Sequence, residues 1–175
     1  MQNKESYLLL LGGPSSRTAI DLVTNSAGDD PEVFEFLVRL ITHGEDPFPR
    51  NATWALDSID MQFPDLIIPY LKTLIQSANK FQQTGTLRNI LKILSRKNIP
   101  AAFHGKLIHH CFEWLYDKKI PVAVKVYAMQ IIMNLSEEYP ELKQELGEAL
   151  EDMYLSSSPG FKARANKILR SLKRI

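Results

Sequence analysis

The residues best suited to bind a metal ion lie within one short stretch and supply imidazole and thiol donors: His104, His109, His110 and Cys111. Such donors suit zinc and similar ions. Adjacent residues on a helix point about 100° apart, and no two of these four have the spacing of three or four residues that places side chains together. We therefore predict no metal site from them. Cys111 falls on an apolar stripe, which favours a buried, inert thiol over a reactive or ligating one.

A glycine-rich segment near the N-terminus, Gly12-Gly13-Pro14-Ser15-Ser16, has the composition of a phosphate-binding loop. It lacks the Lys-Ser/Thr pair and the preceding strand with which such loops hold a nucleotide. A helix break followed by a serine cap accounts for the same residues. We therefore expect no cofactor at this segment or elsewhere in the chain.

The two tryptophans, Trp54 and Trp114, each lie beside the apolar stripe of a predicted helix rather than within it. Two interpretations stay open for each of them. The indole packs between helical hairpins, which is the more common role, or it stands partly exposed as an anchor for a partner. Both residues are therefore candidate binding residues.

The helices that carry these candidates repeat along the chain. Four helical segments bring a small or apolar residue to the same register at Ala52, Ile90, Ala128 and Ala165, with spacings of 38, 38 and 37 residues. This period, with two helical patterns in each repeat, is typical of stacked hairpins that bury their apolar faces only against a neighbour. A small side chain lets two helices approach closely. The sequence predicts an all-α fold, a HEAT-like or armadillo-like α-solenoid of about four helical pairs.

The domain organisation follows from the helical patterns and their breaks. We expect one helical-repeat domain over 1–175, with less regular N-terminal helices in 1–29 and a helix between Asp30 and Gly44. Repeats are predicted at 47–82, 84–119 and 121–156, with a C-terminal half-repeat at 158–175. In the N-terminal part, the predicted core positions are Ala19, Leu22, Val23, Val33, Leu37, Leu40 and Ile41. In the first repeat they are Ala52, Ala55, Leu56 and Ile59, then Leu66, Tyr70, Leu71, Leu74, Ile75 and Ala78 on the second helix.

Length and charge set further limits. A chain of 175 residues is long enough to bury a core without a disulfide. The net charge is +1, but segments 1–76, 77–135, 136–155 and 156–175 carry −6, +7, −6 and +6. In a solenoid, residues that are close in sequence are also close in space. We therefore expect these segments to form separate acidic and basic zones on the surface. The apolar run at 7–11 is too short to span a membrane, and we expect a cytoplasmic protein with no membrane partner.

Several motifs resemble those of a known family: Ala52-Thr53-Trp54-Ala55-Leu56, Cys111-Phe112-Glu113-Trp114, Lys125-Val126-Tyr127-Ala128-Met129 and Ser158-Pro159-Gly160-Phe161-Lys162-Ala163-Arg164-Ala165. From about residue 30 onward the chain resembles an uncharacterised family of small bacterial HEAT-like repeat proteins. Many members carry the label adenylosuccinate lyase without that enzyme's motifs. The resemblance implies a helical-repeat fold and no particular activity.

The lyase label can be compared with the residues. Relatives of that enzyme carry a loop of the form Ser-Ser-x-Met-Pro-x-Lys-x-Asn, which supplies a serine base. The nearest segment here, 156–164, keeps two serines and the lysine but lacks the methionine, the proline and the asparagine. The same residues fit Ser158 as a helix cap and Pro159 at the first helical position. We therefore predict that the protein is not an enzyme and has no catalytic residues.

The helical pairs instead favour a module that binds a protein or peptide. In such arrays the second helix of each pair usually lines a concave groove, and fold analogy extends this to the present chain. The predicted lining residues lie opposite the core stripes, with the two tryptophans beside them: Lys72, Gln76, His109, Glu113, Gln144, Glu148, Trp54 and Trp114.

The alternative is a nucleic-acid-binding protein related in fold to the HEAT-like DNA alkylation-repair proteins. Those proteins use a basic concave surface, aromatic residues and a catalytic aspartate, and Trp54 with Asp57 would supply the last two. The basic stripe Arg88, Lys92 and Arg96 lies on a first helix, where we expect a solvated, convex face. The acidic second helix near 141–152 would also repel phosphate.

Overall fold

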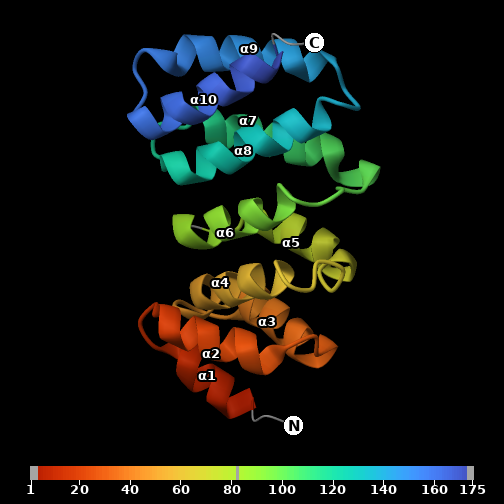
Figure 1. The fold of residues 1–175 in the computed structure, drawn as a ribbon, viewed down its shortest axis with the longest axis vertical. Helices are drawn as coiled ribbons and strands as arrows, with labels where there is room; N and C mark the ends of the chain where they lie inside the picture. Colours follow the sequence, from red (N-terminus) through yellow and green to blue (C-terminus); the bar gives the residue numbers. More distant parts are fainter. Residues whose placement is uncertain (1–3, 82, 173–175) are drawn as a thin grey trace. The chain divides into compact units, whose positions relative to one another are not determined.

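The computed structural model describes residues 4–81 and 83–172, and within them the secondary structure is helical, with no strand (Figure 1). The chain divides into two compact units, Met1–Arg96 and Lys97–Ile175. This division falls inside the predicted repeat 84–119, so its first helix belongs to one unit and its second helix to the other. The all-α prediction is confirmed.

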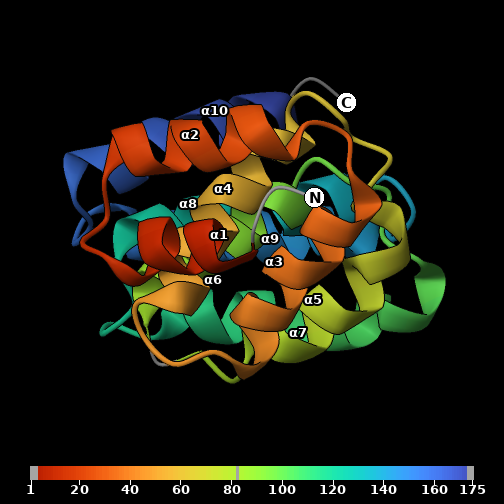
Figure 2. The same cartoon turned by 90° about the horizontal axis from the view of Figure 1, so that it is seen from below.

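The first unit consists of six α-helices and one 3-10 helix among the residues that can be described: α1 (Lys4–Gly12), α2 (Arg17–Ala27), α3 (Pro31–His43), α4 (Phe48–Asp60), η1 (Ile68–Tyr70), α5 (Leu71–Ala78) and α6 (Thr84–Leu94). Helix α4 is central, because it packs against α1, α2, α3 and α6 (Figure 2). Helix α5 packs against α3 and α6. Four of the other five described α-helices of this unit therefore pack around α4.

The second unit contains η2 (Ala101–Phe103), α7 (His104–Tyr116), α8 (Val122–Leu135), α9 (Glu141–Tyr154) and α10 (Pro159–Leu172). Helix α8 packs against α7, α9 and α10, and α9 packs against α10. Because α8 has neighbours on several sides, its buried residues are spread around its circumference: Val124, Lys125, Ala128, Met129, Ile131, Ile132 and Leu135. In the part of the chain that the structure covers, no helix has the length and apolar character needed to cross a bilayer.

The recurring position of the repeat is buried in every helix that carries it. Ala52, Ile90, Ala128 and Ala165 each have 0% of their surface exposed. They lie on α4, α6, α8 and α10, the helices that open successive repeats. The periodicity therefore identified true core positions.

The N-terminal helices differ from prediction in the face that they bury. Helix α3 starts as expected, because the Asp30 side chain accepts a hydrogen bond from the Glu32 backbone N–H at 2.9 Å, and Gly44 is its C-cap. Its buried residues are Phe34, Leu37, Val38 and Ile41, whereas Val33 and Leu40 are only half-buried. In α2 the buried apolar residues are Ile20, Val23 and Ala27 rather than Ala19 and Leu22.

The reason for this error is that each of these helices has two overlapping apolar stripes. Leu22 is 53% exposed, and Ile20, Val23 and Ala27 form the stripe that is buried instead. Spacing alone does not distinguish two such stripes. The choice is made by packing, because α2 and α3 both lie against α4.

The second helix of the first repeat begins later than Leu66, where its apolar pattern starts. The chain forms turns and η1 first, and α5 begins at Leu71. Pro69 has no backbone N–H and disfavours an α conformation at Ile68, so a regular helix cannot run through this segment. Leu66 and Tyr70 are accordingly only half-buried. The similar Tyr139-Pro140 segment has no second proline, and α9 starts directly at Glu141.

The last helix starts as predicted. Pro159 is the first residue of α10, and the hydroxyl of Ser158 accepts a hydrogen bond from the backbone N–H of Phe161 at 3.4 Å. This contact is the serine cap expected from the sequence. The serine and proline of this segment are thus explained by the start of a helix.

We expect Ala128→Phe to lower the free energy of unfolding by about 1–3 kcal/mol, because a phenyl ring at this fully buried position would displace neighbouring side chains. Urea unfolding followed by circular dichroism measures the change. Ala123→Phe, at an exposed position of the same helix, is the matched control and should change stability by less than about 0.5 kcal/mol. Equal midpoints for the two variants would contradict the packing assigned to Ala128.

Candidate functional site

The predicted lining residues are distributed over both units. In the first unit, Lys72 and Gln76 are exposed on α5 and Trp54 is half-buried on α4. In the second unit, four predicted residues are exposed and Trp114 is half-buried: His109 and Glu113 on α7, and Gln144 and Glu148 on α9. All six polar residues are therefore accessible to a partner, whereas each tryptophan is partly covered by its own unit.

Within the second unit, α9 presents a continuous stripe of carboxylates. Glu141, Glu145, Glu148 and Asp152 are all exposed and recur at helical spacing on a different side of the helix from the buried Leu142, Leu146 and Leu150. Gln144 donates a hydrogen bond from Nε2 to Oε1 of Glu148 at 2.9 Å. Because all four carboxylates are exposed, the negative charge of the stripe faces solvent.

The negative charge of this stripe acts on an aromatic residue of α7, Tyr116. Tyr116 is 54% exposed, and its pKa is raised by partial burial and by the negative charges of Glu145, Asp152 and Glu148. These three carboxylates therefore lie within electrostatic reach of the phenol. We refer to Tyr116, Glu145, Glu148 and Asp152 as the acidic face.

A second polar cluster lies on α7 itself. Nδ1 of His110 lies 2.7 Å from Oε2 of Glu113, and Nε2 of His109 lies 3.5 Å from Oε1 of the same carboxylate. The hydrogen bond with His110 is the main cause that lowers the pKa of Glu113. The His110 ring lies 5.8 Å from the ring of Trp114. Sequence reasoning compared histidines only with each other and with Cys111, and missed that Glu113 is three and four residues away from the two histidines.

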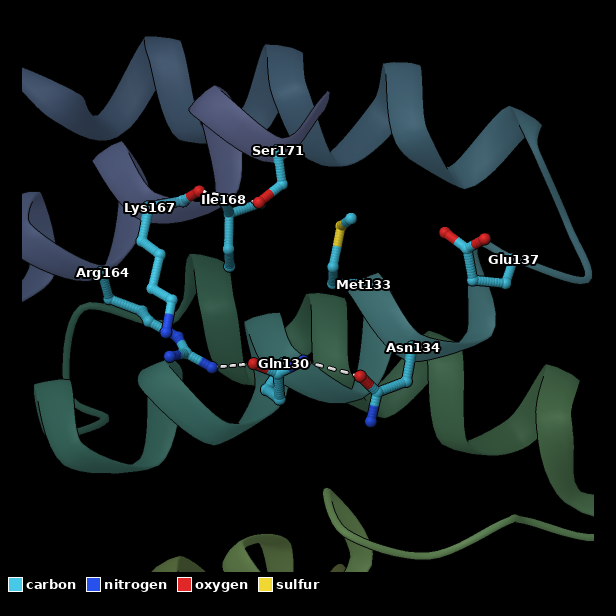
Figure 3. A pocket seen from close by; sticks show the side chains of 8 residues that line it. All are labelled: Gln130, Met133, Asn134, Glu137, Arg164, Lys167, Ile168 and Ser171. Carbon is cyan, nitrogen blue, oxygen red and sulfur yellow. Dashed lines mark hydrogen bonds between the residues drawn. The ribbon is translucent and has the colours of Figure 1, made fainter. Parts of the chain in front are cut away.

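A hollow with a volume of about 310 Å³ lies between α8 and α10 of the second unit. Figure 3 shows the side chains that line it. Met133 and Ile168 contribute apolar side chains, and Arg164 donates a hydrogen bond to the Gln130 side chain (Figure 3). The full lining is Gln130, Met133, Asn134, Glu137, Arg164, Lys167, Ile168 and Ser171. None of the predicted binding residues lies here, because those of the second unit are on α7 and α9.

In the first unit, all three members of the predicted solvated stripe Arg88, Lys92 and Arg96 keep contact with solvent, but Lys92 and Arg96 also pair with buried aspartates, which was not predicted. Lys92 lies 2.6 Å from Asp57, and Arg96 lies 2.8 Å from Asp57 and 2.7 Å from Asp60. Both aspartates are buried on α4. Burial opposes the charge of Arg96, but its hydrogen bonds with Asp60 and Asp57 outweigh burial and raise its pKa. We refer to these four residues as the ion cluster.

The ion cluster changes the interpretation of Asp57. Its two carboxylate oxygens accept hydrogen bonds from Lys92 and Arg96, and its side chain is only 7% exposed. A carboxylate that acts as a base on a bound substrate has to reach that substrate. Asp57 therefore joins α4 to Lys92, near the end of α6, and to Arg96 just beyond it. Arg88 is exposed and instead bonds to the side chain of its neighbour Asn89.

The remaining sequence candidates have structural roles. His104 is buried, with Nε2 2.6 Å from the Ile99 carbonyl and Nδ1 3.1 Å from the Tyr139 hydroxyl. Cys111 is buried as predicted, and burial raises the pKa of its thiol. Gly12 ends α1, and residues 13–16 form the loop before α2. The Asn51 side chain holds this segment by donating to the Leu11 and Gly13 carbonyls at 2.8 and 2.9 Å.

We expect Arg96→Met to cost about 3 kcal/mol of stability, because it removes the guanidinium from two buried carboxylates. Arg88→Met, which removes an exposed arginine eight residues earlier in the sequence, should cost less than about 0.5 kcal/mol. Urea unfolding of both variants is the measurement. If the two variants unfolded at the same urea concentration, the ion cluster would not stabilise the fold.

We also expect the Cys111 thiol to be inert in the native protein, because the reactive thiolate is disfavoured by burial and the sulfur is 0% exposed. With a chromogenic disulfide reagent, the folded chain should release no colour over minutes. The same chain in concentrated guanidinium should react with one equivalent. Rapid reaction of the folded chain would show that the region around α7 opens readily.

The comparisons with known proteins agree with the helical-repeat architecture. A family model described as HEAT repeat domain matches residues 10–172, which is most of the chain. The searches of curated proteins and of solved structures returned no match. The periodic buried positions, the all-helical structure and this match lead to one conclusion: the chain belongs to the HEAT repeat domain family.

Proposed function

We propose that this protein is a non-enzymatic, cytoplasmic binding module that uses exposed second-helix surfaces to hold a protein or peptide partner. The observation that carries the proposal is the acidic face of the second unit, where Tyr116 stands exposed within reach of Glu145, Glu148 and Asp152. HEAT repeats commonly serve as interaction modules, which supports the same class of function. The partner segment for this face is cationic.

The chemistry of the acidic face favours a basic peptide. Exposed tyrosine is enriched at protein interfaces, because its ring supplies contact area at a small entropic cost and its hydroxyl can bond at the rim. The three carboxylates of the acidic face attract lysine and arginine side chains. The arginine guanidinium also stacks on aromatic rings. Charge complementarity of this kind accelerates association and selects against acidic partners.

The other predicted lining residues extend the proposal along the second helices. His109 and Glu113 on α7 and Gln144 on α9 belong to the same unit as the acidic face. Lys72 and Gln76 on α5 would contact a partner independently in the first unit. Trp54 and Trp114, each half-buried, would add only their exposed edges.

Nucleic acid is the less favoured partner. Lys92 and Arg96 already neutralise Asp57 and Asp60, so two members of the basic stripe have partners within the protein. The acidic face would repel phosphate. The exposed cations that could still contact a nucleic acid include Arg88 and, on α10, Lys167 and Arg170.

We expect a cationic peptide to bind the protein, with the acidic face as its site. Fluorescence anisotropy with matched lysine/arginine-rich and glutamate-rich peptides measures the preference. Combined Glu145→Gln, Glu148→Gln and Asp152→Asn should weaken binding by at least about tenfold, since each lost charge contact removes a fraction of the binding free energy. The matched control neutralises three exposed carboxylates of the first unit, Asp29, Glu32 and Glu45, and should leave binding unchanged.

Two results would contradict the proposal. One is equal affinity for the two peptides, and the other is an equal loss in both triple variants. A gel-shift titration with duplex and single-stranded oligonucleotides at ~100 mM salt tests the alternative. Sub-micromolar binding that is lost on combined Lys167→Gln and Arg170→Gln would make nucleic acid the preferred partner. The ion cluster is left intact in this variant, so a loss would not reflect unfolding.

A further inference from the structure

We propose that His109, His110 and Glu113 form a binding site for a divalent transition-metal ion, with Zn²⁺ as the probe, on the exposed side of α7. Their ligand atoms all lie within 4.8 Å of one another. The site needs no partner to assemble, because all of its ligands come from one helix, and it shares His109 and Glu113 with the residues proposed to contact a peptide.

The distances are close to those of a bound ion. In tetrahedral zinc coordination, with bonds of about 2.0–2.1 Å, two ligand atoms are separated by roughly 3.3 Å. Nε2 of His109 lies 3.5 Å from one carboxylate oxygen of Glu113, and Nδ1 of His110 lies 2.7 Å from the other. Small side-chain rotations would therefore bring the three donors around one ion. The ion would replace the hydrogen bond between His110 and Glu113.

Helix geometry explains why two adjacent histidines can share this ion. Side chains of neighbouring residues diverge, but Glu113 is four residues after His109 and three after His110, so its carboxylate lies between them. The two imidazole rings are 5.4 Å apart. The carboxylate thus bridges two histidines that would not meet by themselves.

Neighbouring side chains restrict His110, whereas His109 and Glu113 are accessible to solvent. The His110 side chain is 19% exposed and lies against Trp114, with ring centroids 5.8 Å apart and an interplanar angle of 30°. His109 and Glu113 are exposed, so an ion can enter from solvent. This is the arrangement of an open site, in which three protein ligands leave the remaining positions to water.

The donor set also selects the class of ion. Two imidazoles and a carboxylate suit Zn²⁺, Ni²⁺ and Cu²⁺, whereas Mg²⁺ and Ca²⁺ prefer oxygen donors alone. Cys111 follows the histidines directly, but it points into the core with its sulfur fully buried. It is therefore not a ligand of this site.

Calorimetric titration of the full-length chain, without an affinity tag, with zinc chloride tests the proposal. We expect one ion per chain. His109→Ala and Glu113→Gln should each weaken binding by at least about tenfold, because each removes a direct ligand. His43→Ala removes an exposed histidine of α3 and should leave affinity unchanged. Both ligand positions are exposed, so the variants should keep the wild-type circular dichroism spectrum.

A spectroscopic measurement locates the ion. In a Trp54→Phe background, emission comes from Trp114, and Cu²⁺ bound beside His110 should quench it in a saturable way that excess Zn²⁺ reverses. Glu113→Gln should abolish the quenching. The proposal is overturned if zinc binds the wild type and the Glu113→Gln variant equally, or if no saturable binding occurs below about 1 mM. Neither result would bear on the acidic face, which lies on other residues.

Discussion

Each helical pair of this protein has apolar stripes that only neighbouring helices can cover, and the rest of the structure depends on that coverage. In the first unit α4 is surrounded by α1, α2, α3 and α6, and in the second α8 is surrounded by α7, α9 and α10. The central helices carry fully buried alanines, Ala52 and Ala128, where a longer side chain would hold the neighbours apart. Apolar burial of this kind is the main favourable contribution to folding.

Surrounding a helix in this way makes partners within the protein favourable for the polar groups that it buries. On α4, Asp57 and Asp60 pair with Lys92 and Arg96, and Asn51 donates to the backbone before α2. On α8, the buried Lys125 donates from Nζ to the Leu115 carbonyl at 2.9 Å, near the end of α7. Burial lowers the pKa of this lysine. The polar contacts of the central helices therefore join neighbouring helices and give each pair a defined register.

The groups available for binding are found on the outer helices. The acidic face lies mainly on α9, and the His109, His110 and Glu113 cluster lies on α7, both open to solvent. The hollow between α8 and α10 combines apolar and charged side chains on the opposite set of helices (Figure 3). One unit of a repeat protein can thus offer several chemically distinct surfaces on a shared core.

The sequence by itself determined the helical class, the repeat period, the buried register at Ala52, Ile90, Ala128 and Ala165, and the caps at Asp30 and Ser158. These features depend on local spacing and on backbone chemistry, which the order of residues specifies. Only the tertiary structure decided which of two apolar stripes α2 and α3 bury, because that choice depends on contact with α4. It also decided that Lys92 and Arg96 meet buried aspartates 35 to 39 positions away, since charge partners distant in sequence come together only when helices pack.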